Sequence, residues 1–164
     1  MALLSNTTWF FFYVFVYTAL TLAQLSISQN SVKDYLAVHN AARAKVGVGP
    51  LSWNRTLAAY ANKYAKSRLP VCELEHSQGP YGENLAQGYG EFSKVDAAKM
   101  WIGEKPNYDH RSNKCVGGEC LHYTQVVWRN TVSIGCARVR CKEGIVFITC
   151  NYYPPGNYVG ENPY

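Results

Sequence analysis

The sequence predicts an α+β domain in which helices come first and an antiparallel sheet follows. Between Ser31 and Pro106, apolar residues recur at the spacing of amphipathic helices. After Thr124, β-branched residues alternate with other residues, as in half-buried strands. All six cysteines lie in the part of the chain after Val71. An even number of cysteines in a chain this short favours a disulfide-bonded domain.

Three helices are predicted, and each begins at a residue that favours the N-cap position. They are expected to run from Ser31 to Gly47, from about Asn54 to Arg68, and from Ser93 to the residue before Pro106. In the first and third helices, an aspartate follows the N-cap serine by three positions (Asp34 and Asp96), which is a variant of the capping box. Glycine ends the first helix, and proline cannot continue the other two.

Three strands are predicted in the last third of the chain: Thr124–Trp128, Ile134–Cys141 and Ile145–Tyr152. The last two flank Lys142-Glu-Gly144, a three-residue loop with a glycine available for the left-handed position. A loop of this kind joins the two strands of a hairpin.

The hairpin register also predicts disulfides. It places Cys136 opposite Cys150, and directly opposed residues are close enough to bridge. Cys115 and Cys120 close a short loop that contains two glycines, which leaves Cys72 to reach Cys141. Because no Cys-x-x-Cys pair is present, neither a zinc ribbon nor a thioredoxin-type redox site is expected.

The N-terminal segment is predicted to be a secretory signal, residues 1–28. It carries no charged side chain, and Trp9–Leu25 is almost wholly apolar. Small residues allow cleavage after Ser28 or, alternatively, after Ala23. An uncleaved membrane anchor is the other interpretation, because the run approaches the minimum spanning length of about 17 residues. Secretion is favoured, and disulfides fit an oxidising extracellular compartment.

The formal net charge of +5 favours anionic partners such as microbial membranes or cell-wall polymers. The sequence contains no basic helix, no run of lysine and arginine and no stacking motif. A nucleic-acid partner is therefore not expected.

Four motifs carry a resemblance to a known family. They are His39-Asn-Ala-Ala-Arg43, Gly82-Glu-Asn-Leu85, His122-Tyr-Thr-Gln-Val-Val-Trp-Arg-Asn130 and Cys150-Asn-Tyr-Tyr-Pro-Pro-Gly-Asn157. In this order on one short chain, they resemble the CAP superfamily (cysteine-rich secretory, antigen 5, pathogenesis-related 1), and most of all its plant pathogenesis-related 1 proteins. The resemblance runs from about Ser31 to Tyr164, nearly all of the predicted mature domain, residues 29–164.

The resemblance implies a three-layer α-β-α sandwich stapled by the same three disulfides. It implies a secreted plant defence protein of the apoplast, without enzymatic turnover, which we expect to be a monomer. Sterols or other apolar lipids are the implied ligands, and sterol withdrawal is the implied antimicrobial mechanism. Trp101 and Tyr108 are the candidate lipid-binding residues, since Tyr108 falls in a loop that family members use to bind sterols.

The resemblance also implies a cleft in which two histidines and two acidic residues converge. The matching positions in this sequence are His76, Glu83, Glu104 and His122. Two imidazoles and two carboxylates suit zinc, with room left for water or a ligand. The alternative is a metal-free network of hydrogen bonds that fixes the walls of the cleft. No cofactor is expected to be required.

An enzyme is not expected, and no catalytic residue is assigned. The cysteines are committed to bridges, and no Gly-x-Ser-x-Gly elbow is present. Metal-dependent hydrolysis by the histidine and glutamate cluster is the remaining enzymatic alternative, although it lacks the His-Glu-x-x-His spacing.

Three further features are noted. His39 and Arg43 share a helical face, where a hydrogen-bonding role that anchors the helix is favoured over a ligand site. Asn54 begins a glycosylation sequon near a helix start. Leu121 departs from the family signature, which normally has a small or charged residue before the histidine.

The C-terminal segment Pro154–Tyr164 is predicted to leave the sheet, because two prolines cannot continue a central ladder. Plant members of the family are reported to release a defence peptide from this position, so cleavage between Tyr153 and Pro154 is predicted. The alternative is an ordinary C-terminal strap that packs on the domain.

Overall fold

The computed structural model describes residue 9, residues 11–18 and residues 31–164. Residues 11–18 form a short helix, and most of the predicted signal segment lies outside the described residues. Among the described helices, none has both the length and the apolar character needed to cross a membrane. The signal segment and its cleavage after Ser28 or Ala23 therefore stay predictions.

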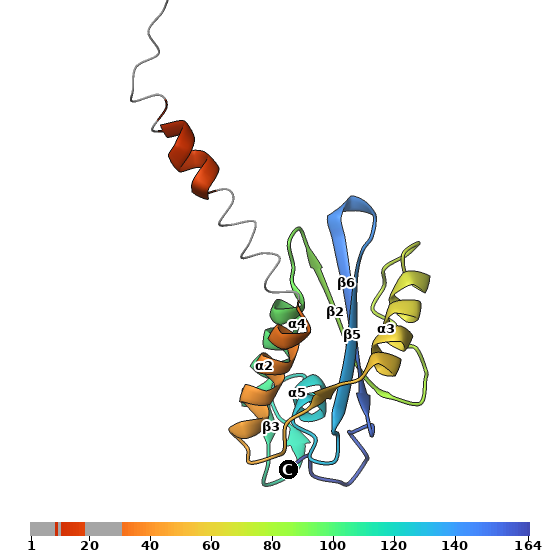
Figure 1. Ribbon diagram of the computed structural model, residues 1–164. Coiled ribbons are helices and arrows are strands. Elements are labelled where there is room, and N and C mark those ends of the chain that lie inside the picture. Colours follow the sequence, from red (N-terminus) through yellow and green to blue (C-terminus); the bar gives the residue numbers. More distant parts are fainter. Residues whose placement is uncertain (1–8, 10, 19–30) are drawn as a thin grey trace, which may run out of the picture.

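The domain has three layers, with one sheet between two layers of helices (Figure 1). The sheet has four strands in the order β1-β5-β6-β2. Their bounds are Ser52–Trp53 for β1, Ser133–Arg140 for β5, Ile145–Tyr153 for β6 and Gly82–Tyr89 for β2. β5 and β6 pair antiparallel, as predicted, and β2 pairs antiparallel with β6, whereas the short β1 pairs parallel with β5. The sheet is therefore mixed at one edge.

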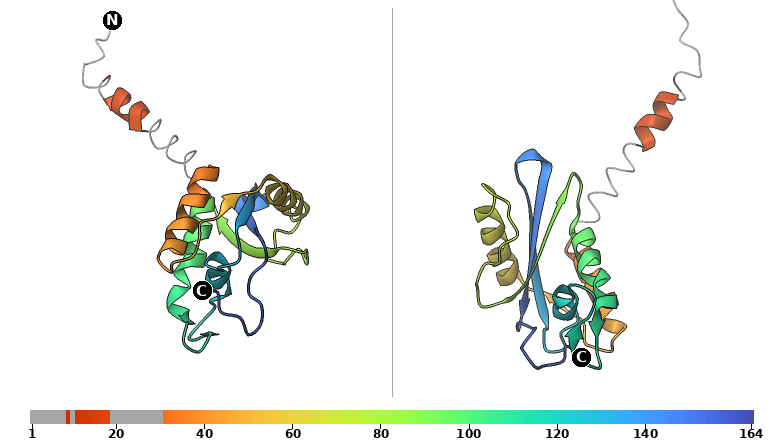
Figure 2. Two further views of the ribbon diagram at one scale, coloured as in Figure 1. Left: turned by 60° about the horizontal axis from the view of Figure 1, so that its bottom comes forward. Right: turned by 180° about the vertical axis from the view of Figure 1, so that it is seen from behind.

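Helices cover both faces of this sheet, which confirms the α-β-α sandwich (Figure 2). One layer contains α2 (Val32–Ala44), α4 (Lys94–Gly103) and α5 (Leu121–Val126), and the other contains α3 (Arg55–Ser67). Beneath the first layer lies the larger core, which includes Tyr35, Trp101 and Tyr152. The smaller core, which includes Ala61 and Phe147, lies beneath α3.

The helix starts lie where the sequence predicts them. Ser31 and Ser93 cap α2 and α4, and in both cases the aspartate three positions later completes the capping box. Asn54 caps α3, because its Oδ1 accepts hydrogen bonds from the amides of Thr56 and Leu57. A cap of this type stabilises a helix by about 1 kcal/mol.

The predicted hairpin and all three disulfides are confirmed. Cys136 lies opposite Cys150 in the ladder between β5 and β6. The loop between the strands is a 3₁₀ turn, η2 (Lys142–Gly144), in which Glu143 and Gly144 both have positive φ. The bridges are Cys72–Cys141, Cys115–Cys120 and Cys136–Cys150.

The predicted strand Thr124–Trp128 is wrong, because most of this segment belongs to the six-residue helix α5. Its β-branched residues favour a strand locally. At the start of the helix, however, the amides of His122 and Tyr123 donate to Glu104 Oε2 at 3.1 and 3.2 Å. A carboxylate from another element therefore satisfies the first N–H groups, and this tertiary contact outweighs the local preference.

Strand β2 was not predicted from the sequence. Its residues Gly82–Tyr89 include two glycines and no β-branched side chain, so the local strand signal is weak. The strand forms because every one of its residues pairs with a residue of β6, and these main-chain hydrogen bonds do not depend on the side-chain pattern. Also missed were β1 and a small antiparallel pair between α4 and α5. The pair consists of β3 (Tyr108–Asp109) and β4 (Lys114–Cys115), and it follows the 3₁₀ turn η1 (Lys105–Asn107).

The predicted anchoring role of His39 and Arg43 is confirmed. The guanidinium of Arg43 donates to four main-chain oxygens, at distances of 2.6 to 3.0 Å, in Gly49, Val126, Trp128 and Thr131. His39 is fully buried between the main-chain oxygen of Tyr35 (2.8 Å) and the hydroxyl of Tyr152 (3.0 Å). Burial, together with the charge of Arg43, lowers the pKa of His39 to about 3.

The depressed pKa of His39 predicts that the protein loses stability in acid. Between pH 6.5 and about 3, the unfolded chain binds a proton at His39 that the folded chain does not bind. The free energy of unfolding should therefore fall with pH by up to about 1.4 kcal/mol per pH unit from this group. Urea titrations between pH 4 and 6 measure the slope. His39→Gln should lower the free energy of unfolding at neutral pH. It should also reduce the slope of that free energy against pH by the contribution of up to one bound proton. Equal slopes in the variant and the unaltered protein would contradict the depressed pKa of His39.

Candidate functional site

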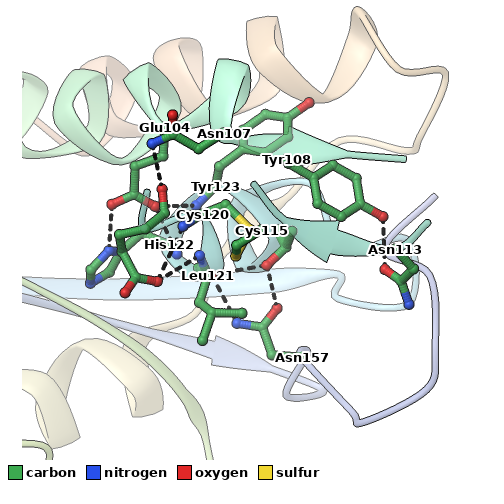
Figure 3. Close-up of a disulfide and its surroundings, with 12 residues drawn as sticks. Glu104, Asn107, Tyr108, Asn113, Cys115, Cys120, Leu121, His122, Tyr123 and Asn157 are labelled. Carbon is green, nitrogen blue, oxygen red and sulfur yellow. Dashed lines mark hydrogen bonds and ion pairs between the residues drawn. A yellow bond between two sulfur atoms is a disulfide. The ribbon is translucent and has the colours of Figure 1, made fainter. Parts of the chain in front are cut away.

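The first element of the candidate site is the pair Glu104 and His122 (Figure 3). Glu104 lies at the C-terminal end of α4, and His122 lies in the first turn of α5. His122 Nδ1 is 2.6 Å from Glu104 Oε1, while the other carboxylate oxygen caps the start of α5. The ring of Trp101 stacks on His122, with the centroids 6.4 Å apart. The imidazole is therefore held on two sides, and its second nitrogen remains to bind a ligand.

Glu119, which the sequence analysis missed, lies beside this pair. Its Oε1 accepts hydrogen bonds from the amides of Leu121 (2.9 Å) and Cys120 (3.2 Å). Asn107 Nδ2 donates to its main-chain oxygen at 2.9 Å. Within the described residues, ligand atoms of Glu104, Glu119 and His122 all lie within 4.8 Å of one another. The available signal was the Cys115–Cys120 bridge, which fixes Glu119 three positions before the signature histidine.

The second pair consists of His76 and Glu83. His76 Nδ1 is 2.8 Å from Glu83 Oε1, which also accepts from the amide of Ser77 at 2.8 Å. Asn151 Nδ2 donates to Glu83 Oε2 at 3.2 Å. These side chains border a polar pocket of about 300 Å³ that also includes Gln78 and Tyr81.

Hydrogen bonding favours the charged forms in this second pair. The hydrogen bond to Glu83 raises the pKa of His76, although partial burial acts in the opposite direction. Burial by itself raises the pKa of Glu83, but hydrogen bonds from His76, Ser77 and Asn151 outweigh it, so the net pKa is lowered. An imidazolium–carboxylate pair is therefore favoured in mildly acidic surroundings.

The four residues of the predicted cleft form two histidine–glutamate pairs. Asn84, next to Glu83 on β2, donates to the main-chain oxygen of His122 at 3.0 Å. Because neighbouring residues on a strand face opposite sides, the side chain of Glu83 extends away from α5. Within the described residues, the cluster whose side chains are close enough together to bind one metal ion contains Glu104 and His122. It does not contain His76 or Glu83.

The two predicted lipid-binding residues differ in their exposure. Trp101 is 2% exposed, and its indole N–H donates to the main-chain oxygen of Leu85 at 2.9 Å, so it belongs to the core. Tyr108 is partly buried, and its hydroxyl donates to Asn113 Oδ1 at 2.9 Å. Tyr108 is thus the one of the two that borders a cavity, together with the exposed Leu121.

A separate groove runs between α2 and α4. It measures about 460 Å³, and its lining consists of Ala37, Val38, Ala41, Ala42, Lys45, Lys99, Ile102 and Gly103. Small apolar side chains form most of this lining. The two lysines supply the only charged groups among these lining residues.

The remaining predicted positions also have clear places. The side chain of Asn54 is partly exposed, and its Oδ1 caps α3. A glycan would be attached to Nδ2 of the same side chain. Tyr153 ends β6 and is 51% exposed, and the chain leaves the sheet at Pro154, as predicted. Glycosylation and cleavage stay predictions.

Comparison with known proteins shows the family to which this chain belongs. Residues 36–152 match the cysteine-rich secretory protein family, CAP. The basic form of pathogenesis-related protein 1 from Nicotiana tabacum is 57% identical over 143 residues, which is 87% of this chain and 81% of that protein. Pathogenesis-related protein 1 from Arabidopsis thaliana is 54% identical over 154 residues, 94% and 95% of the two chains. The structure of Schistosoma mansoni venom allergen-like protein 4 has a TM-score of 0.64 and 30% identity, covering 80% of this chain and 92% of that one.

With the sandwich, the bridges and the signature histidine in place, these matches show that the chain belongs to the CAP family. Within the family it is similar over most of its length to the plant pathogenesis-related protein 1 group, at 54–57% identity to the two relatives above. This similarity supports a role in plant defence.

The donor set of Glu104, Glu119 and His122 predicts zinc binding. Two carboxylates and one imidazole make a three-ligand site that leaves a position for water. Calorimetry at pH 7 should show binding that His122→Gln abolishes and that Glu119→Gln weakens by about 10-fold or more. Binding should weaken as the pH falls, because zinc binds the deprotonated forms of its ligands.

His76→Gln is the matched control for this prediction, because it removes a histidine of the other pair. Zinc affinity should remain unchanged in this variant. If His76→Gln weakens binding as much as His122→Gln does, the two pairs share one ion and the three-residue site is wrong. If the unaltered protein gives no zinc heat, the site is a hydrogen-bond network only.

Proposed function

We propose that this protein is a secreted defence protein that binds sterols or related apolar lipids in the groove between α2 and α4. The observation that carries the proposal is an apolar groove of about 460 Å³ between two helices that are otherwise packed together. Ligand pockets have volumes of about 300–1,000 Å³ and are mostly apolar, so the groove is of suitable size.

The lining of the groove suits an amphipathic lipid. Ala37 and Ala41 expose small apolar side chains on α2, and Ile102 closes the groove from α4. Lys45 and Lys99 border it and can meet a hydroxyl or carboxylate headgroup with their ammonium groups. A long apolar body with one polar end is the class of ligand that these groups fit.

Secretion and lipid binding together suggest an antimicrobial mechanism. Three disulfides fit the oxidising conditions of the apoplast, where the predicted signal segment would direct the chain. The net charge of +5 favours approach to anionic microbial surfaces. A monomer that withdraws sterol from such a surface would inhibit a sterol-dependent microbe without chemical turnover.

The groove can be tested by filling it. Ala41→Phe should weaken binding of ergosterol by on the order of 10-fold, because the ring occupies the space of the ligand. Ala59→Phe is the matched control, because Ala59 is an exposed alanine of α3 on the other side of the sheet. Palmitate binding measured beside ergosterol separates a sterol preference from general lipid binding.

The same samples should be assayed for growth inhibition of a sterol-requiring microbe. Glu104→Gln should leave lipid binding and inhibition intact, whereas a metal-dependent hydrolase would lose its activity. If Ala41→Phe binds and inhibits as well as Ala59→Phe does, the groove is not the lipid site.

A second candidate function, precursor of a C-terminal signalling peptide, is favoured by the exposure of Tyr153 at the point where the chain leaves the sheet. An endopeptidase would add water across the bond between Tyr153 and Pro154 and free the segment Pro154–Tyr164. We expect mass spectrometry of extracellular fluid from stressed tissue to recover this peptide. Recovery of intact C-termini alone would reject the precursor function and leave the lipid-binding function untouched.

A further inference from the structure

The segment Pro154–Tyr164, here called the strap, forms one wall of a second cavity. Figure 3 shows Asn157, in the first part of the strap, beside Leu121 of α5. This cavity measures about 300 Å³ and lies apart from the groove between α2 and α4, with which it shares no lining residue. Its opposite wall consists of the Cys115–Cys120 bridge and residues of α5.

The first end of the strap is tied firmly to the domain. The hydroxyl of Thr131 donates to the main-chain oxygen of Pro154 at 2.8 Å, and the amide of Gly156 donates to Gln125 Oε1 at 2.9 Å. Asn157 accepts from the hydroxyl of Thr124 at 2.7 Å and donates to the main-chain oxygen of Leu121 at 2.8 Å. Residues 154–157 are therefore held at several points.

The second end of the strap is also tied. The amide of Arg129 donates to the main-chain oxygen of buried Pro163 at 2.6 Å. The ring of Tyr164 stacks on His110, with the centroids 4.7 Å apart, and its hydroxyl lies 3.3 Å from that of Tyr123. Both ends of the strap are thus fixed, but by different contacts.

The middle of the strap is held far less. Residues 158–162 are exposed, and Val159 is fully so. The main contacts here are a turn hydrogen bond from Glu161 to Tyr158, a donation from Asn113 to the main-chain oxygen of Glu161 (2.9 Å) and a tilted contact of Tyr158 with Trp128. Gly160 has a φ of +85°, which glycine tolerates best. Few buried contacts between two fixed ends make this the segment that can move.

The cavity that the strap covers is mostly apolar and aromatic. Its apolar lining includes Tyr108, Leu121, Trp128, Tyr158, Val159 and Pro163. Of the polar lining residues, Asn113 and Asn157 are already paired with Tyr108 and Thr124, and Glu161 brings one carboxylate to the strap side. A ligand here would be recognised chiefly by apolar and ring contacts. The volume is at the lower end of the range of ligand pockets, which suits a small ring compound.

We propose that this cavity is a binding site for a small aromatic amphiphile and that residues 158–162 are its movable wall, so that ligand binding and closure of the strap stabilise each other. A ligand that contacts both walls binds the closed form better than the open form. It therefore shifts the strap toward closure by the ratio of those affinities. This proposal does not depend on lipid binding between α2 and α4.

The test uses the full mature chain, labelled with ¹⁵N, and 2-naphthol as the probe. Titration should shift the amide signals of Leu121, Val159 and Gly160 in a saturable manner. At a probe concentration of ten times the Kd, hydrogen exchange of the amides in 158–162 should slow by about 10-fold, because exchange requires opening of the ligand-bound wall. Without the probe, the amide of Gly156, which is bonded to Gln125 Oε1, should exchange more slowly than those of 158–162.

Two substitutions in the strap distinguish the effect of altering the cavity lining from the effect of adding a negative charge to the strap. Tyr158→Asp replaces an aromatic ring of the lining with a carboxylate and should weaken binding of 2-naphthol by about 10-fold or more. Asn162→Asp adds the same charge to an exposed position that does not line the cavity, and it should bind as the unaltered chain does.

Two results would overturn the proposal. If the shifts concentrate on Ala41 and Ile102, the probe occupies the groove between α2 and α4 and the cavity is not a site. If the cavity signals shift while exchange in 158–162 stays the same, the strap is not a wall that moves with the ligand.

Discussion

The buried guanidinium of Arg43 is the interaction on which most of this structure depends. Its four acceptors are carbonyl groups, and two of them, those of Trp128 and Thr131, follow the end of α5 outside the strands and helices. The carbonyl of Trp128 also accepts from the amide of Thr131 at 3.1 Å. A buried carbonyl group without a partner costs about 1–3 kcal/mol. Burial lowers the pKa of Arg43 to about 10, so the group remains a cation at neutral pH. One side chain of α2 thereby fixes residues 126–131.

Residues 126–131 in turn hold the parts of the molecule that could bind ligands. They begin at the last residue of α5, the helix that brings His122 to Glu104. Arg129 and Thr131 donate to the two ends of the strap. A contact in the core is therefore connected to a polar site and to the wall of a cavity through one irregular segment. The Cys115–Cys120 bridge completes this side of the domain by fixing Glu119 and the opposite wall.

The surface offers spaces of different chemical character. The histidine–glutamate pairs are polar, whereas the α2–α4 groove and the cavity beneath the strap are mainly apolar. All six cysteines are bridged, so none can act as a thiolate nucleophile. The proposed binding of apolar molecules would use the two apolar spaces of a disulfide-bonded domain. It is also compatible with the defence role of the family.

The sequence by itself determined the features that depend on near neighbours. The caps at Ser31, Asn54 and Ser93 and the hairpin register that pairs Cys136 with Cys150 require contacts only a few residues away, or across one tight turn. The four polar positions came from the family motifs rather than from spacing. The tertiary structure alone decided that residues 121–126 are helical, because their capping carboxylate, Glu104, lies on another helix. It also decided that Glu119 joins His122 and that the strap folds back, since both depend on partners distant in the chain that no local pattern encodes.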